Sequence, residues 1–233
     1  LTSTSQSIDI TVGAAAKVAL VRPAAGFVNR VAFSTQPVVE IQDVSGNKIA
    51  TATDTVTVSV STGATVDGLS SAASAMGAND WSSVSTANQL SLRGAVGTYT
   101  ITYAVAGLTS ATQSVTLTHG AATQLSVHTA AAGAQAGIAF STQPVIYIED
   151  ADHNLVTTGA EAALNIRASA SGGTLAGTDT VQASGGIATF ANLNLSGATA
   201  SYTLTYAVTN AGYGSLTTSQ SLSLAAGTAV KLG

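Results

Sequence analysis

The sequence predicts an all-β protein in which one β-sandwich domain is copied in tandem. Three observations predict this fold class: a long internal repeat, short segments in which apolar residues alternate with Thr or Ser, and the lack of a segment with helical periodicity. A period of two places one face of a strand in a core and the other in solvent. Several such strands in about 100 residues, separated by turn residues, are typical of a β-sandwich.

The internal repeat has a period of 107 residues. The phrase Ala-Phe-Ser-Thr-Gln-Pro-Val at residues 32–38 recurs at 139–145, and Gly-Ala-Ala at 13–15 recurs at 120–122. Self-similarity at a fixed period is the sequence signature of a tandem architecture.

Two complete copies are therefore expected over residues 13–119 and 120–226. Residues 1–12 match the end of a copy and residues 227–233 match its start, which predicts a last strand of a preceding repeat and a first strand of a following one. Two explanations of these terminal pieces stay open. Either the array continues beyond both ends, or the terminal strands complement neighbouring subunits by donor-strand pairing.

Within the copies, alternation of Val, Ile, Leu or Tyr with Thr, Ser or Ala marks the half-buried strands. In chain order these segments are residues 8–12, 56–60, 99–105, 115–117, 202–208 and 222–224. Pro37 and Pro144 are expected to open further strands, where a missing N–H costs least. Tyr99 and Tyr202 lie early in a late strand, as in the tyrosine corner of β-sandwiches.

A tight turn is expected after the strand that Pro37 opens. Asp43 is suited to cap this turn, and Gly46 to adopt a positive φ within it. His153 replaces Gly46 in the second copy, and His tolerates that conformation better than most residues.

The two copies differ in one large core side chain. Aligning Tyr99 with Tyr202 pairs Phe190 with Ala87, so the first copy lacks an aromatic residue at that position. A hole of this size costs about 3–5 kcal/mol. We therefore expect Trp81, which has no counterpart in the second copy, to fill the volume that Phe190 fills there.

Several phrases resemble bacterial immunoglobulin-like (Big-type) tandem repeats of large cell-surface proteins, which are related in architecture to invasin and intimin repeats. Residues 36–47 and 143–154 resemble their Gln-Pro-Val…Asp-x-x-Gly-Asn signature, 186–193 their Gly-Val-Ala-Thr-Phe segment, and 97–100 their late Gly-Thr-Tyr. The first copy departs from the family at 82–92, where the Gly-x-Ala-Thr-Phe phrase is missing. The resemblance implies tandem immunoglobulin-like β-sandwich domains with an extracellular spacer, adhesin or surface-layer role and no catalysis.

Composition narrows the function classes further. Charged residues make up only 8% of the chain, the formal net charge is −4, and only seven Lys and Arg are present. A nucleic-acid binder needs clustered Lys and Arg, and a membrane span needs an apolar run of about 20 residues, so neither partner is expected. The chain contains no Cys, which excludes disulfides and thiolate metal sites. A neutral surface rich in Ser and Thr favours association with its neighbours.

The three His residues are candidates for catalysis or metal binding, but none recurs in the other copy. His119 aligns with Val12, His128 with Val21 and His153 with Gly46. Solvated or strand-surface roles are the simpler interpretation. No nucleophile elbow or phosphate-binding Gly loop is present, so we expect no enzyme.

One candidate metal site remains. Four residues in the second copy offer oxygen ligands at closely spaced positions, as calcium prefers: Glu149, Asp150, Asp152 and Asn154. Capping of the turn is the alternative role for the same side chains.

Residues 62–82 are expected to form a long connection in the first copy. Loops of this length are often functional, which makes the segment a candidate contact surface. A mobile insertion or a small edge hairpin is the alternative.

Two function classes are open on these grounds. The first is a non-enzymatic extracellular structural module of a surface layer, sheath, filament or stalk, whose partners are neighbouring copies or adjacent repeats. The second is an adhesin repeat that binds a cell-surface glycan or a host or partner-cell protein. The scarcity of aromatic residues, at 5%, favours the structural class.

Overall fold

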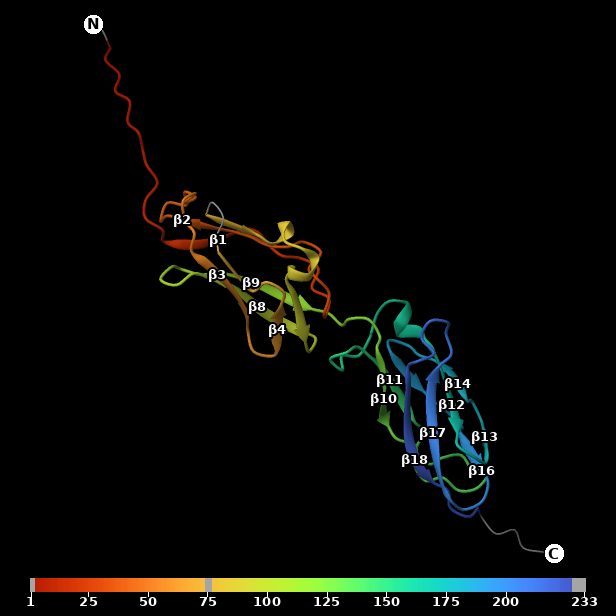
Figure 1. Cartoon of the computed structure of the whole chain (residues 1–233). Coiled ribbons are helices and arrows are strands. Elements are labelled where there is room, and N and C mark those ends of the chain that lie inside the picture. The colour runs from red at the N-terminus through yellow and green to blue at the C-terminus, as the bar shows by residue number, and fades with distance from the viewer. Residues whose placement is uncertain (1–2, 74–76, 228–233) are drawn as a thin grey trace, which may run out of the picture. The chain divides into compact units, whose positions relative to one another are not determined.

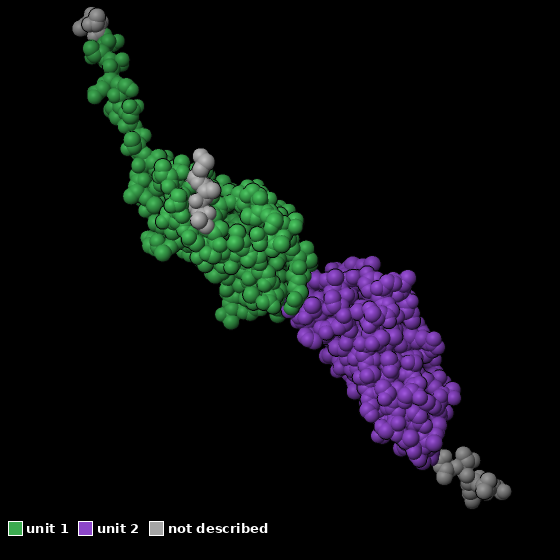
Figure 2. Space-filling view, viewed as in Figure 1, with its two compact units in different colours: residues 1–118 green, residues 119–233 purple. Residues whose placement is uncertain are grey.

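The computed structural model describes residues 3–73 and 77–227 of the chain. The chain divides into two compact units, Leu1–Thr118 and His119–Gly233 (Figure 2). Nearly all of the regular secondary structure in both units is β-strand (Figure 1). The helical segments among the described residues are three short 3₁₀ turns: η1 (Trp81–Ser83), η2 (Thr86–Asn88) and η3 (Ala160–Ala163).

Unit 1 contains two sheets and a separate strand pair, all antiparallel. The three-stranded sheet has the order β1 (Lys17–Arg22), β2 (Val38–Gln42), β6 (Ala78–Asp80). The four-stranded sheet has the order β5 (Ser71–Ala73), β3 (Thr55–Val60), β8 (Gly97–Ala104), β9 (Ala111–Leu117). The pair consists of β4 (Ala64–Asp67) and β7 (Ser91–Gly94).

Unit 2 repeats this arrangement. Its three-stranded sheet has the order β10 (Gln124–Thr129), β11 (Val145–Glu149), β15 (Ile187–Thr189). Its four-stranded sheet has the order β14 (Thr180–Gln182), β12 (Asn165–Ala170), β17 (Ser201–Val208), β18 (Thr217–Ser223), and its strand pair consists of β13 (Thr174–Ala176) and β16 (Asn194–Ser196). In both units, buried side chains from the two sheets form one core, which makes each unit an immunoglobulin-like β-sandwich.

The repeat in the sequence is a repeat in the structure. Strand β1 pairs with β2, and β10 with β11, in registers that match residue for residue at an offset of 107 positions, including a bulge near the end of β1 and of β10. Phe33 and Phe140 are 4% and 3% exposed, and each donates its backbone N–H to the carbonyl of an equivalent residue, Leu90 or Leu193.

The expectation for Trp81 is confirmed. Its backbone N–H points to the carbonyl of Pro37 at 3.3 Å, as that of Phe190 points to Pro144 at 3.1 Å. The Trp81 ring is 1% exposed and lies 6.3 Å from that of Tyr103, whereas the Phe190 ring lies 5.5 Å from the equivalent Tyr206.

This placement corrects the alignment near Phe190. Ala87 is exposed on η2 and is not the structural partner of Phe190. The phrase that is absent from 82–92 occurs in altered form at Gly77–Trp81, where Gly77 adopts φ 72° as Gly186 adopts φ 80°. The extra residues of the first copy follow Trp81 and form η1 and η2.

The expected long connection at 62–82 is wrong for most of its length. Its described residues form β4, β5, β6 and η1, while 74–76 lie outside the described residues. The strands were hidden because each has three or four residues, too few to display an alternation.

Two local predictions hold in both units. The Tyr99 hydroxyl donates to the Ala95 carbonyl at 2.7 Å and the Tyr202 hydroxyl to the Ala198 carbonyl at 2.9 Å, which is the tyrosine corner. Pro37 and Pro144 directly precede β2 and β11.

The described part of the N-terminal piece does not pair. Residues 3–12 form no strand in this structure and are exposed, although their sequence matches the β9 region. The other terminal piece, 227–233, lies outside the described residues except for Gly227.

Candidate functional site

The turn after β2 is organised by the carboxylate of Asp43. Oδ1 accepts hydrogen bonds from the backbone N–H groups of Ser45 (2.9 Å) and Asn47 (2.8 Å). Oδ2 accepts from the Asn47 side chain (3.0 Å) and from the backbone N–H of Gly13 (3.0 Å). These bonds, led by that from the Asn47 amide, lower the pKa of Asp43 to about 2. Gly46 adopts φ 92°, as expected for this turn.

Asp150 builds the same turn after β11. Its Oδ1 accepts from the backbone N–H groups of Asp152 (2.9 Å) and Asn154 (3.0 Å), and its Oδ2 from the Asn154 side chain (3.0 Å). Oδ2 also accepts from the backbone N–H of Gly120 at 2.8 Å. His153 takes the position of Gly46 with φ 61°. In each unit, the aspartate thereby ties the first residue of the repeat to the end of a core strand.

Of the four candidate calcium ligands, Asp150 and Asn154 bond to each other in this turn, and Asp152 donates its backbone N–H to Asp150. Glu149 and Asp150 are consecutive at a strand end, so their side chains leave on opposite faces. Glu149 accepts a hydrogen bond from Ser126 (2.7 Å) and contacts His153 Nδ1 (3.2 Å). Over residues 3–73 and 77–227, no group of three or more His, Asp or Glu side chains is arranged to hold a metal ion. The contacts therefore fit turn capping by Asp150 and Asn154.

The three His residues lie in separate environments. His119 contacts the Gly120 carbonyl through Nδ1 and the Thr158 hydroxyl through Nε2, both at 2.9 Å. The His128 ring stacks on Tyr147 with centroids 4.0 Å apart and planes inclined by 8°. His153 contacts Glu149, as described above. The three imidazoles therefore have different contact residues.

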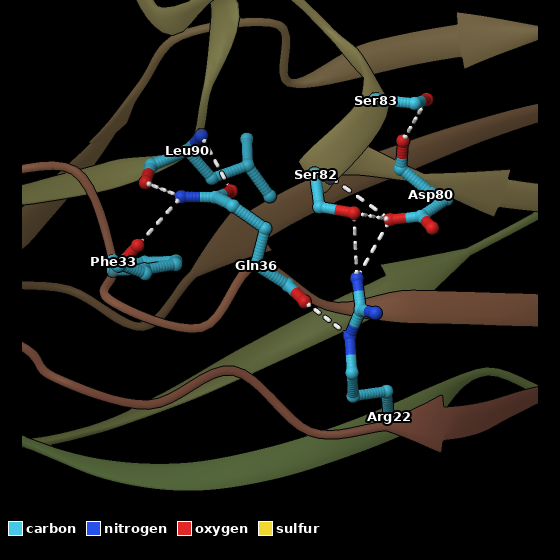
Figure 3. Close-up of polar contacts among 7 residues, drawn as sticks. All are labelled: Arg22, Phe33, Gln36, Asp80, Ser82, Ser83 and Leu90. Atoms are coloured by element: carbon cyan, nitrogen blue, oxygen red, sulfur yellow. Dashed lines mark hydrogen bonds and ion pairs between the residues drawn. The ribbon is translucent and has the colours of Figure 1, made fainter.

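A glutamine in each unit, buried at Gln36 and half-buried at Gln143, is a feature that sequence reasoning missed. The Gln36 amide donates to the carbonyls of Phe33 (3.2 Å) and Leu90 (2.9 Å) and accepts from the Leu90 N–H (2.9 Å), as Figure 3 shows. Gln143 makes the corresponding bonds to Phe140 and Leu193. Its recurrence in the Gln-Pro-Val phrase of both copies was the available signal.

A second polar cluster occurs in unit 1 alone. Arg22 Nη2 lies 2.7 Å from Asp80 Oδ1 and 3.0 Å from the Ser82 hydroxyl, and its Nε donates to the Gln36 carbonyl (Figure 3). Hydrogen bonds from Ser82 lower the pKa of Asp80. Both charged side chains are 42% exposed, so the ion pair contributes about 0–1 kcal/mol. In unit 2, Thr129 and Thr189 occupy the positions of Arg22 and Asp80. The cluster therefore links strands of unit 1 and is not a site that the two units share.

Comparisons with known proteins identify no activity. No protein-family model and no curated protein matches the chain. Similar solved structures include invasin, described as a bacterial integrin-binding protein, with 14% identity and a TM-score of 0.33 over 90% of this chain and 39% of that one. Domains 1–6 of the surface layer protein SbsC show 12% identity and a TM-score of 0.35 over 94% and 29% of the two chains.

A β-glycosidase from Bacteroides vulgatus is similar to the same degree, with 12% identity and a TM-score of 0.36 over 91% of this chain and 25% of that one. The chain therefore spans well under half the length of each of these three proteins. At such identities and scores, the similarity carries no argument about function. Within the described residues, no helix is both long and apolar enough to cross a membrane.

Proposed function

We propose that this chain is a non-enzymatic structural repeat module of an extracellular microbial surface protein, as found in a surface layer, sheath, filament or stalk. The observation that carries the proposal is what the two units share. They share the side chains that build the scaffold, whereas the chemically reactive side chains differ between them.

The shared side chains all form hydrogen bonds with backbone groups. Asp43 and Asp150 organise a turn, Gln36 and Gln143 satisfy buried backbone groups, and the tyrosine corners close a connection. Each of these groups hydrogen-bonds to backbone N–H or carbonyl groups of its own unit. A domain copied for its shape keeps such residues, because losing one leaves buried backbone groups unpaired.

The outward faces support the structural class as well. On unit 1, β8 and β9 place Thr and Ser opposite each other in three successive cross-strand pairs: Thr98–Thr116, Thr100–Ser114 and Thr102–Thr112. On unit 2, β17 and β18 do the same: Ser201–Ser223, Thr203–Ser221 and Thr205–Ser219. Uncharged hydroxyl surfaces repel one another little, which favours lateral packing of neighbouring modules.

The test is the assembly state of the purified chain. Negative-stain electron microscopy and sedimentation at increasing concentration are expected to show regular fibres or sheets, with neighbours that bury more than about 1,000 Å² per contact. Replacing Thr100 and Ser114 with Lys on the hydroxyl face of β8 and β9 is expected to disperse them. Monomers at all concentrations, retained on a glycan array, would instead indicate the adhesin class.

One observation favours the adhesin alternative. His128 and Tyr147 form a stacked pair on the three-stranded sheet of unit 2, and His128 is exposed. Sugar rings pack on such aromatic faces. If the adhesin alternative holds, His128→Ala with Tyr147→Ala abolishes retention on a glycan array. The matched control is unit 1, where Val21→Ala with Glu40→Ala, at the equivalent positions, leaves retention unchanged.

A further inference from the structure

The N-terminal segment repeats the strand that closes each sandwich. Residues 1–12 and 108–119 are identical at six of twelve positions, and Ile8 and Ile10 stand where β9 has Val115 and Leu117. Between these apolar residues lies a polar one, Asp9 in the segment and Thr116 in β9. The segment therefore carries the inward-facing side chains of a last strand.

Those inward-facing side chains are core residues in both units. Val115 and Leu117 are 3% and 0% exposed, opposite Tyr99 and Gly97 of β8. Leu222 and Leu224 occupy the equivalent positions of unit 2 and are 5% and 4% exposed. In the N-terminal segment, by contrast, Ile8, Ile10 and Val12 are 76%, 92% and 51% exposed. Burial of such aliphatic side chains in a core stabilises the pairing of a strand with its sandwich.

A glutamine specifies which groove such a strand fits. Gln113 accepts a hydrogen bond from the Ala24 N–H (3.0 Å) and donates to the Ala24 carbonyl (2.7 Å), so its amide pairs with backbone as another strand would. Gln220 does the same with Ala131, at 3.0 Å for both bonds. Gln6 occupies this position in the N-terminal segment.

The residue that follows the strand adds a backbone pairing. Thr118 donates to the Phe27 carbonyl (2.9 Å) and accepts from the Asn29 N–H (3.0 Å), in parallel orientation. Ala225 makes the same two bonds with Ala134 and Ala136, both at 3.0 Å. Thr11 stands at this position in the N-terminal segment.

We propose that residues 3–12 are a docking strand whose partner is an immunoglobulin-like sandwich of this repeat type that lacks its own last strand. The groove of that partner has the free edge of a strand like β8, with which residues 3–12 pair. It also has space for the side chains of Ile8 and Ile10, and an alanine whose backbone N–H and carbonyl both bond to the Gln6 amide. Units 1 and 2 are not the partner, because β9 and β18 already fill their grooves. The proposal holds equally for a structural module and for an adhesin.

The chain spacing after the segment agrees with this assignment. Six residues separate Leu117 at the end of β9 from Gln124 at the start of β10, and six separate Ile10 from Lys17 at the start of β1. Docking of residues 3–12 thus joins a third sandwich to unit 1 through the same length of chain that joins unit 1 to unit 2.

The first experiment grafts the segment into unit 1 of the full chain. Residues 108–119 are replaced with the sequence of residues 1–12 through Ala111→Thr, Thr112→Ser, Val115→Ile, Thr116→Asp, Leu117→Ile and His119→Val. Unit 1 is expected to fold with its Tm shifted by less than about 8 °C. The control graft carries Leu117→Asp in place of Leu117→Ile and is expected to lose the unit 1 transition. A first graft that also leaves unit 1 unfolded overturns the proposal.

The second experiment measures docking between molecules. Leu222→Asp with Leu224→Asp in the full chain releases β18 from its groove, and a fluorescent peptide of residues 1–12 is titrated into this variant. Saturable binding is expected that is absent with the wild-type chain and at least tenfold weaker for the peptide with Ile8→Asp and Ile10→Asp. Binding of a peptide of residues 215–226, without binding of the 1–12 peptide, overturns the proposal. Equal binding of the 1–12 peptide and its Asp form overturns it as well.

Discussion

Units 1 and 2 build the same sandwich but fill its centre differently. Unit 2 uses Phe190, which directly precedes the connection to Leu193, whereas unit 1 uses Trp81 followed by nine positions to Leu90. The larger indole also reaches across the core, where its Nε1–H donates to the Leu69 carbonyl at 2.8 Å. One core position thus tolerates a change of side chain when the adjacent connection changes with it, because both must share a fixed volume.

The largest loss of stability is expected from removing the aromatic core residue of either unit. It tests whether Trp81 and Phe190 fill the same position in their cores. Trp81→Ala is expected to lower the free energy of unfolding of unit 1 by about 3–5 kcal/mol and to leave unit 2 unchanged, and Phe190→Ala to do the reverse. Urea titrations followed by amide NMR signals of each unit measure both. A loss below about 1 kcal/mol in either variant contradicts the equivalence.

A smaller loss of unfolding free energy is expected from replacing Gln36 or Gln143. Gln36→Ala removes the partner of the buried Leu90 N–H and of the Phe33 carbonyl, whereas the Leu90 carbonyl keeps its bond from the Phe33 N–H, and we expect a cost of about 2–3 kcal/mol. Gln143→Ala is expected to cost less, because Gln143 is only partly buried whereas Gln36 is 4% exposed. The same urea titrations measure both. The variant Gln182→Ala, at an exposed position of β14, serves as a control with a change below about 0.5 kcal/mol.

The third prediction concerns the pH dependence of the stability of unit 1, to which the Asp43 carboxylate contributes. The pKa of Asp43 in the folded chain is about 2, below its ordinary value of 3.8, so the folded state favours the ionised carboxylate. Its contribution to stability is fully present above pH 4 and is lost as the pH falls through 2. Asp43→Asn is expected to flatten the pH dependence of the urea midpoint of unit 1 between pH 4 and 2. An unchanged slope in the variant would show that the turn does not depend on the charge.

The smallest change in stability is expected from removing the hydroxyl group of either buried tyrosine, Tyr103 or Tyr206. The Tyr206 hydroxyl donates to Gln220 at 3.3 Å, whereas the Tyr103 hydroxyl is buried without a partner among the described residues. Tyr206→Phe is expected to cost about 1 kcal/mol, and Tyr103→Phe to leave unit 1 as stable or up to about 1 kcal/mol more stable. Thermal unfolding of the two variants measures the difference. A larger loss for Tyr103→Phe contradicts the assignment.

Features that depend on nearby residues were predictable from the sequence. The turns at Asp43 and His153, the strands that follow Pro37 and Pro144, and the tyrosine corners each involve residues within a few positions of one another. Local backbone preferences decide such features, so residue type and spacing carry them.

Features that depend on distant partners were not predictable. Strand β4 exists because Ala64–Asp67 pairs with Ser91–Gly94 far along the chain, and neither segment alternates clearly. The role of Gln36 depends on the Leu90 backbone, 54 positions away. The contacts of two candidate calcium ligands also depend on distant residues, because Asp150 accepts from the Gly120 N–H and Glu149 from the Ser126 hydroxyl.

The sequence by itself therefore determined the all-β class, the 107-residue repeat and the residues that cap its turns, because periodicity and local conformation are written in adjacent positions. The tertiary structure alone decided that the extra residues of the first copy follow Trp81, that the 62–82 segment contains strands, and that Gln36 and Gln113 bind distant backbone. Those outcomes follow from close packing and from the need to pair buried backbone groups, and both depend on which distant segments meet in the fold.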